Sequence, residues 1–245
     1  MHILPKILTD LAPTSVLRVA INYGNPVLAK PHPTHGTPTG ISAELAEEIA
    51  SRLGVPYRYE TYDAAGKVFA ALGRGDCDIG FLAIDPVRAE GIRFTEPYAE
   101  IKGTYLVRHE SRFQHVEDVD TDGVRIAVGR GAAYDLHLSR ELKHARLERA
   151  ETSAAAIDLF VENALDAAAG VRQPLLRWTA EHPGYRVLEG DFTTIRQAVA
   201  IPANRSDDAA RLLHHMIEDI KSTAFVRAAL ERSGETAVTV VPPLR

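Results

Sequence analysis

Short apolar runs alternate with amphipathic stretches along most of the chain. The run Val16–Ile21 is followed by a polar loop, and a helical spacing of apolar residues then extends from Leu45 to Leu53. Short apolar runs bounded by turn residues are typical of buried strands, whereas a spacing of three to four is typical of a helix. The pattern therefore predicts a strand and then a helix that is capped by Ser42 and stopped by Gly54.

The same alternation continues along the next part of the chain. Tyr57–Tyr62 alternates as a strand does, Asp63 is a helix cap, and the helical pattern after it ends at Gly73 or Gly75. A third apolar run ends at Ile84. Strands that alternate with helices in this way predict an α/β fold with a parallel sheet and helices on both faces.

A second unit of the same kind begins with the strand pattern Val124–Val128. The segments Thr104–Val107 and Arg196–Ile201 read as strands that leave the first unit and return to it. We therefore predict two α/β lobes joined by a two-strand hinge. Residues 1–107 and 196–245 form lobe 1, residues 108–195 form lobe 2, and further helices are expected over 132–142, 154–163, 207–221 and 225–232.

Composition narrows the function. The 245 residues are 45% hydrophobic and 25% charged, as in an ordinary globular protein, and the net charge of -5 disfavours a nucleic-acid-binding face. The single Cys77 excludes an internal disulfide and is expected to be an inert core residue. No apolar run approaches the roughly 20 residues of a membrane-spanning helix.

The segment around Asp85 carries the strongest chemical signal. An apolar run stops at Asp85-Pro86, which is typical of a helix N-cap followed by proline at the first helical position, and Arg88 follows within one turn. The amides of that first turn and the Arg88 guanidinium together suit one carboxylate.

This segment and its continuation Phe94-Thr95-Glu96-Pro97-Tyr98 resemble the extracellular solute-binding proteins of family 3, the polar amino-acid receptors of ABC importers. Two further signs are the Gly129-Arg130-Gly131 turn and Leu165-Asp166-Ala167, and the likeness covers residues 16 to 234. The resemblance implies the type II periplasmic-binding-protein fold, with a small ligand in the cleft between the lobes. It also implies a periplasmic monomer that has no cofactor and delivers its ligand to an ABC transporter permease.

The resemblance assigns the ligand carboxylate to Arg88 in lobe 1. Phe81 and Ala83 stand where the family has hydroxyl or small polar residues, so only a backbone amide near Ala83 remains as a donor there. Two alternatives stay open. The first is that Arg88 lies on a helix surface and pairs with Asp85 or Glu90, and the second is that Phe81 is a core residue.

In lobe 2 the resemblance assigns ligand contacts to the helix start at Gly131, Ala132, Ala133 and Tyr134. The family's hydroxyl residues are replaced by alanines, so backbone amides are the donors that we expect here. Tyr134 either closes on the ligand or packs inside the lobe.

The family's aspartate for the ligand ammonium is missing, because its place falls at Val171 and the next residue is Arg172. A cation there repels an ammonium group and attracts a second anion. We therefore expect an organic acid, a dicarboxylate or an atypical, acidic amino acid as the ligand. Alternatively, Arg172 is a surface residue at a strand end. Asp166 is expected to be structural.

Four more polar residues are candidate ligand contacts. Asn22, Tyr23 and Asn25 follow the first strand, and Lys67 opens a helix at the same end of the sheet. The alternative for Lys67 is a solvated lysine.

No catalytic set is recognisable, and the helix-face residues His137, Glu141 and His144 do not match a zinc pattern, so we expect neither catalysis nor a metal site. Two alternatives remain to a solute-binding protein. One is an enzyme similar to cyclohexadienyl dehydratase, and the other is a cytosolic carrier or sensor module on the same fold.

The segment Met1–Leu11 is interrupted by Pro5 and Asp10 and does not resemble a secretory leader. Either the protein stays in the cytosol, or this start is not the start of an exported precursor.

Overall fold

The computed structural model describes residues 3–244 and divides them into two compact units. Unit 1 comprises residues 3–63, 67–100 and 196–244, and unit 2 comprises Ala64–Gly66 and Ile101–Ile195. The predicted boundary at residue 107 lies later than this division. The reason is that strand β7 (Ala99–Arg108) starts in unit 1 and continues into unit 2.

The sheet of unit 1 is built on three parallel strands. β1 pairs with β4 on one side and with β5 on the other, and β12 runs antiparallel to β5. Two short strands extend this sheet. β6 pairs with β12, and β13 pairs with the start of β7. The strand bounds are β1 Leu17–Asn22, β4 Tyr57–Tyr62, β5 Ile79–Ala83, β6 Ile92–Phe94, β12 Thr193–Pro202 and β13 Thr239–Val240.

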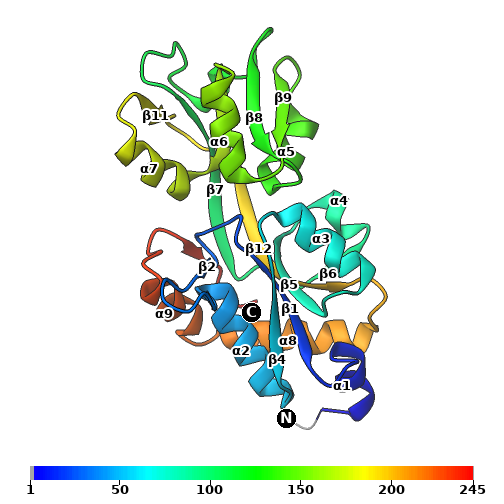
Figure 1. Cartoon of the computed structure of the whole chain (residues 1–245). Helices are drawn as coiled ribbons and strands as arrows, with labels where there is room; N and C mark the ends of the chain where they lie inside the picture. The colour runs from blue at the N-terminus through cyan, green and yellow to red at the C-terminus, as the bar shows by residue number, and fades with distance from the viewer. Residues whose placement is uncertain (1–2, 245) are drawn as a thin grey trace. The chain divides into compact units, whose positions relative to one another are not determined.

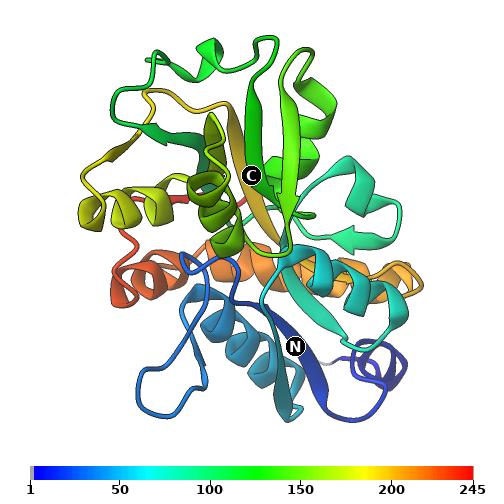
Figure 2. The same ribbon diagram turned by 45° about the horizontal axis from the view of Figure 1, so that its top comes forward.

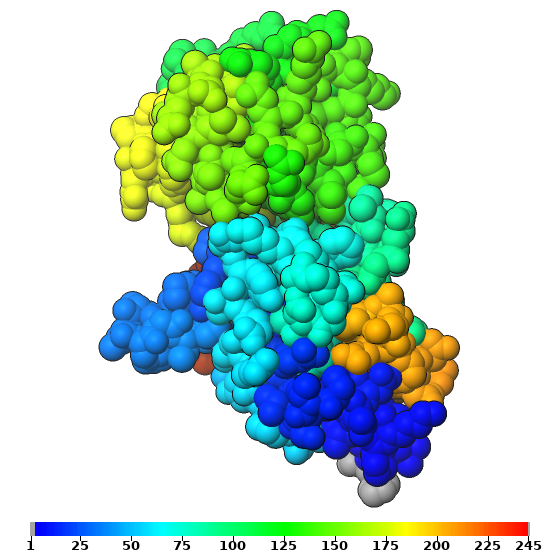
Figure 3. Space-filling model, turned by 45° about the vertical axis from the view of Figure 1, so that its right-hand side comes forward, coloured from blue at the N-terminus to red at the C-terminus, as the bar shows by residue number. Residues whose placement is uncertain are grey.

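Helices pack around this sheet (Figure 1), and α1 lies beside the start of α8 (Figure 3). A two-stranded hairpin, β2 (Lys30–Pro31) with β3 (Pro38–Thr39), extends from unit 1 as the blue loop at the lower left of Figure 2. The helix bounds are α1 Pro5–Leu11, α2 Ile41–Leu53, α3 Ala65–Arg74, α4 Pro86–Ala89, α8 Asp207–Lys221 and α9 Phe225–Arg232.

Two predicted helix caps in unit 1 are wrong. Helix α2 begins at Ile41 after Gly40, whose φ of 101° suits glycine, so Ser42 lies inside the helix and is buried. Helix α3 begins at Ala65, two residues after Asp63. The predicted stop at Gly54 is confirmed, because its φ of 69° ends α2 in a left-handed conformation.

A buried charge cluster holds the amino ends of β1 and β5 together. Asp78, fully buried before β5, accepts hydrogen bonds from Arg18 at 2.7 Å and from Arg205 at 2.9 Å. The Arg18 backbone amide also donates to the same carboxylate. Asp78 thereby links β1 and the segment before α8 to the start of β5.

The sheet of unit 2 has the order β7-β10-β8-β9, with β8 parallel to both β9 and β10, and β11 pairs with β7. Figure 2 shows the helices of this unit against its strands. The bounds are β8 Arg125–Gly129, α5 Ala133–Glu141, β9 Arg146–Ala150, α6 Ser153–Glu162, β10 Ala167–Val171, α7 Arg172–Glu181 and β11 Tyr185–Val187. The α/β fold class is thus as predicted.

The segment Met1–Leu11 was considered above as a secretory leader. Met1 and His2 of this segment lie outside the described residues, and Pro5–Leu11 forms helix α1. Within residues 3–244, no helix has the length and apolar character needed to cross a membrane.

Candidate ligand site

The carboxyl ends of the parallel strands in unit 1 meet at one edge of the sheet. Strands β1 and β4 are in register up to Asn22 and Tyr62, and the backbone amide of Tyr23 donates to the Tyr62 carbonyl at 2.7 Å. In open α/β sheets, ligands bind beyond the carboxyl ends of the strands. The residues that follow β1 and β4 are therefore placed where a ligand site is expected.

A surface cavity of about 380 Å³ opens at this edge, lined by Tyr23, Thr61, Tyr62, Asp63 and Lys67. The structure thus brings together Tyr23 and Lys67, which the sequence pattern had placed at the same end of the sheet. Thr61, Tyr62 and Asp63 were missed. Their signal was present in the sequence, since a β-strand that ends before a helix start places its last residues at this edge.

An ion pair lies in the cavity lining. Lys67 Nζ is 2.6 Å from Asp63 Oδ1, and the two side chains are 51% and 60% exposed. The hydrogen bond from Lys67 lowers the pKa of the Asp63 carboxyl below its usual value, so this carboxyl is ionised at neutral pH. The cavity therefore presents one cation and one anion to solvent.

The two tyrosines of the lining are fixed through their hydroxyl groups. Tyr23 Oη donates to the Gly36 carbonyl at 3.3 Å, and Tyr62 Oη lies 3.6 Å from Cys77 Sγ. Burial raises the pKa of both phenols, that of Tyr62 to about 12, so both are neutral at physiological pH. The rings are thus held before any ligand arrives.

The loop after β1 is also built for rigidity. Asn22 Oδ1 accepts from the Gly24 amide at 2.9 Å, and Asn25 Oδ1 accepts from Val27 at 3.3 Å. A Cβ atom on Gly24 would lie 2.5 Å from the Asp63 carbonyl oxygen, so this loop packs directly on the backbone of Asp63. Asn22 and Asn25 therefore shape the turn, and a contact of either with ligand stays a prediction.

Arg88 belongs to a second, buried group in unit 1. The predicted N-cap is confirmed, since Asp85 accepts from the Val87 amide at 2.9 Å and Pro86 begins α4. Arg88 is only 2% exposed, and its Nη1 donates to the Ala83 carbonyl at 2.9 Å. Burial lowers the pKa of Arg88 to about 10 against the opposing effect of Asp85, which still leaves it charged at pH 7. The alternative of a helix-surface arginine is therefore wrong.

Phe81 and Ala83 lie in β5, which is buried along its whole length. The Phe81 ring packs edge-on against Tyr98, with ring centroids 6.4 Å apart. Ala83 contributes its carbonyl to Arg88. Both residues are core side chains, and a wall or amide contact with ligand remains a prediction.

In unit 2, the helix start at Gly131 is occupied by a side chain of its own helix. The Gly131 amide donates to Asp135 Oδ2 at 2.8 Å, and the buried Asp135 also accepts from Arg149 Nε at 2.9 Å. Ala132 is the N-cap without a side-chain hydrogen bond, and Ala133 begins α5. The expectation of an open amide is therefore wrong for Gly131, because an internal carboxylate already satisfies it.

Tyr134 packs inside unit 2. It is 3% exposed, its hydroxyl donates to Ser153 Oγ at 2.7 Å, and burial raises its pKa to about 12. This bond joins the starts of α5 and α6, the two helices that follow β8 and β9. The burial of Tyr134 and its bond to Ser153 agree with the alternative in which it packs inside the lobe.

Arg172 is held by partners within unit 2. It begins α7, its Nη2 lies 2.7 Å from Asp191 Oδ1, and it also donates to the Gly190 carbonyl and to Thr104. The expectation of an unopposed cation at this place is wrong, because Asp191 neutralises the guanidinium. Asp191 is 19 residues further along the chain, and no local pattern indicated the pair.

Asp166 has the predicted structural role, since its carboxylate accepts from the Arg125 amide at 2.8 Å. In the part of the chain that the structure describes, no cluster of three or more His, Cys, Asp or Glu side chains is arranged to hold a metal ion.

Comparisons with known proteins show the family and the fold. The family model of the bacterial extracellular solute-binding proteins, family 3, matches residues 17–232. The amino-acid-binding protein AabA of Dichelobacter nodosus is 20% identical over 199 residues, which cover 80% of this chain and 79% of AabA. A mutant of ArgBP from T. maritima superposes with a TM-score of 0.78 at 19% identity, covering 93% of this chain and 99% of that one. The fold is that of the type II periplasmic binding proteins.

A further relative is the membrane-bound lytic murein transglycosylase F of Ectopseudomonas mendocina (strain ymp). It is 30% identical over 172 residues, which cover 66% of this chain. The match spans only 35%, about a third, of the transglycosylase.

Proposed function

Because the chain belongs to the bacterial extracellular solute-binding proteins, family 3, we propose that it captures a small carboxylate-bearing ligand and delivers it to an ABC-type importer. The ligand is an organic acid or an atypical amino acid. The observation that carries this proposal is the cavity at the carboxyl edge of the unit 1 sheet, where Tyr23 and Lys67 lie together. The exposed Lys67 ammonium is a suitable partner for a carboxylate.

Arg88 lies just after the carboxyl end of β5, as the buried residue of the short helix α4. A buried guanidinium in a desolvated setting exerts a stronger field than one in water, and it favours an anion nearby. In this proposal Lys67 contacts the ligand carboxylate, and Arg88 adds positive potential at the end of β5. The closing of two lobes around the ligand, and the contacts from Ala132, Ala133 and Tyr134, stay predictions of the family resemblance.

A panel of small acids tests the proposal. Each acid is paired with its neutral amide, and binding is measured as a shift in the melting temperature and then by calorimetry. We expect at least one acid to bind about tenfold or more tightly than its amide, since a charged hydrogen bond is lost in the amide. A panel in which no acid binds, or in which acids and amides bind alike, contradicts the proposal.

Delivery to an importer and a periplasmic location are part of the same proposal. Uptake of the labelled ligand by the native cells should fall when the gene is deleted and recover when it is restored. Cell fractionation should place the protein in the periplasm. Protein found in the cytosol, with uptake unaffected by the deletion, would favour the cytosolic carrier or sensor.

We also propose that the chain is not an enzyme. AabA is a binding protein by its name, whereas the transglycosylase shares only about a third of its length with this chain. Incubation with prephenate should give no phenylpyruvate, which is followed by its ultraviolet absorbance. Steady formation of phenylpyruvate would establish the dehydratase alternative.

A further inference from the structure

We propose that Asp63 is a specificity-determining residue, whose carboxylate binds a cationic nitrogen of the ligand in the cavity at the carboxyl ends of β1 and β4. The inference rests on the proposed function, because it concerns the same cavity. It differs from the sequence expectation, which found no carboxylate for such a group and therefore disfavoured amino-bearing ligands.

The first support is the position of Asp63. The side chain does not cap α3, because the helix begins two residues later at Ala65. Its carboxylate instead lines the cavity and is 60% exposed. It is therefore accessible to a ligand.

The second support is the charge pattern. Asp63 and Lys67 place opposite charges 2.6 Å apart in the same lining. A ligand that carries both a carboxylate and a cationic nitrogen presents the complementary pair, so its carboxylate faces Lys67 and its nitrogen faces Asp63. A purely anionic ligand gains only the Lys67 contact and lies close to the Asp63 charge, which repels it.

The third support is the aromatic lining. Tyr23 and Tyr62 line the same cavity as the pair, and contacts of their hydroxyl groups with Gly36 and Cys77 hold the rings. Phenol rings attract cations through their π-systems, most effectively where water is displaced. Fixed rings beside a carboxylate suit an ammonium or guanidinium group better than they suit a second anion.

The backbone beneath Asp63 is fixed as well. Gly24 approaches the Asp63 carbonyl so closely that a Cβ atom there would lie 2.5 Å from the oxygen, and the Tyr23 amide bonds the Tyr62 carbonyl. The carboxylate therefore extends from a rigid point of the edge. Rigid placement of one charged group favours selectivity between ligands that differ in one charged group.

The test compares acids that differ only in the nitrogen. The probes are L-alanine with pyruvate, L-glutamate with 2-oxoglutarate, and L-phenylalanine with phenylpyruvate, titrated by calorimetry into the intact protein and into Asp63→Asn. For the pair that binds, we expect the amino acid to bind the wild type about 10- to 100-fold more tightly than the oxo acid. Asp63→Asn should reduce this preference to about threefold or less.

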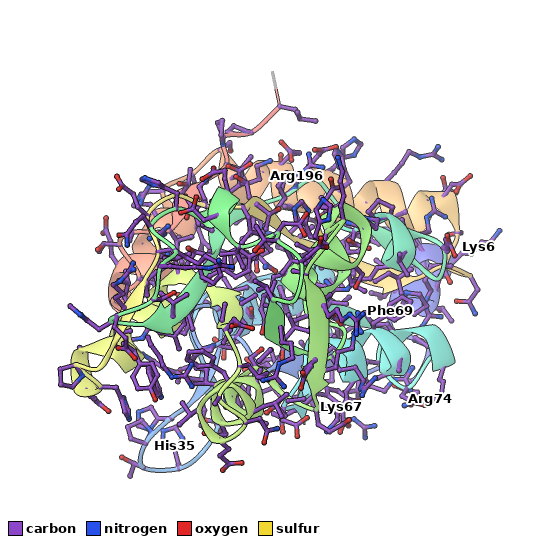
Figure 4. The ribbon with its side chains drawn as sticks, turned by 90° about the horizontal axis from the view of Figure 1, so that it is seen from above. Lys6, His35, Lys67, Phe69, Arg74 and Arg196 are labelled. Atoms are coloured by element: carbon purple, nitrogen blue, oxygen red, sulfur yellow. The ribbon has the colours of Figure 1, made fainter. Side chains whose placement is uncertain are left out.

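Asp76→Asn is the matched control. Asp76 forms an exposed ion pair with Arg74 at the opposite end of α3, and Figure 4 shows Lys67 and Arg74 toward the two ends of that helix. This variant removes the same kind of charge from the same unit, and we expect it to keep the full preference for the amino acid. Both pairs are exposed, so neither substitution should alter the fold.

The outcomes separate the two claims. Equal binding of amino and oxo acids to the wild type, or equal losses for both in Asp63→Asn, overturns the role of Asp63 but leaves carboxylate capture standing. Absence of binding by every acid in the panel contradicts the proposed function itself. Loss of the preference in Asp76→Asn as well as in Asp63→Asn would point to the net charge of the unit and would also overturn the assignment.

Discussion

The sheet of unit 1 has a charged cluster at each end, and the two clusters differ in burial. At the amino end, Asp78 is fully buried between Arg18 and Arg205, whereas the Asp63 and Lys67 side chains at the carboxyl end are 60% and 51% exposed. Breaking a buried pair leaves an uncompensated charge, but an exposed pair contributes little to stability. The first cluster therefore serves the fold, and the second is free to exchange its partner for a ligand.

The largest effect is expected at the buried end. Asp78→Ala should lower the free energy of unfolding by about 3–5 kcal/mol, because two arginines lose a shared partner. Urea denaturation measures the change. Asp76→Ala, which removes a half-exposed carboxylate two residues away, should stay within about 0.5 kcal/mol of the wild type. If Asp78→Ala lowers the free energy of unfolding by less than about 1 kcal/mol, the buried cluster does not stabilise the fold more than the exposed pair does.

At the exposed end, the backbone matters more than the charges. Gly24→Ala should cost about 2 kcal/mol and weaken ligand binding, since its Cβ would meet the Asp63 carbonyl and the loop must shift. Denaturation and calorimetry of one preparation measure both effects. Gly73→Ala is the control, because a Cβ there meets nothing and alanine favours helix α3, so it should stabilise by up to about 1 kcal/mol. A neutral Gly24→Ala would mean that the loop is not rigid.

Unit 2 contains a third type of carboxylate, whose partners are backbone amides. Asp120 accepts hydrogen bonds from the amides of Lys143, His144 and Ala145, each at 2.9 Å. Burial alone would raise the pKa of Asp120, but these bonds outweigh it and the pKa is lowered. Because the folded pKa is depressed, the stabilisation is complete above the unfolded value of about 3.9 and is lost as the pH falls below it.

Asp120→Asn tests whether the pKa of Asp120 is lowered in the folded protein. The variant should be about 1–2 kcal/mol less stable at pH 7, and this deficit should shrink below about pH 4, where the wild type loses the same interaction. Denaturation curves from pH 2 to pH 7 give the comparison. A deficit that stays constant over this range, or that grows toward acid, would contradict the depressed pKa.

The smallest effect is expected at Tyr134. Tyr134→Phe removes the hydrogen bond to Ser153 and should cost about 1 kcal/mol without changing ligand affinity, because the hydroxyl is buried inside unit 2. Calorimetry on the variant separates the two alternatives. Weaker ligand binding with unchanged stability would restore Tyr134 as a residue that closes on the ligand.

Elements with strong periodicity were predictable from the sequence. The strand Tyr57–Tyr62 and the cap at Asp85 agree with the structure because local pattern and proline chemistry decide them. Strand β9, Arg146–Ala150, was missed, because a half-exposed strand rich in arginine lacks an apolar run. Helix α2 begins at Ile41 after an N-cap at Gly40, rather than after a cap at Ser42, and the positive φ of Gly40 suits glycine at this turn.

The candidate site was predictable only in part. Tyr23 and Lys67 follow from their places after a strand and at a helix start, but their common cavity depends on the register of β1 with β4. The partner of Arg172 was not predictable, because Asp191 reaches it through a tertiary contact. The partner of Gly131 is local, since Asp135 lies four residues further along the chain in the first turn of α5, so the capping-box spacing carried its signal.

The most direct test of the central claim is calorimetric titration of one acid and its amide into the wild type, Lys67→Met and the control Arg74→Met. If the cavity of unit 1 captures a carboxylate, the wild type and Arg74→Met prefer the acid about tenfold or more, and Lys67→Met loses this preference. If Lys67→Met keeps the full preference for the acid, the carboxylate is not bound in this cavity and the account is wrong.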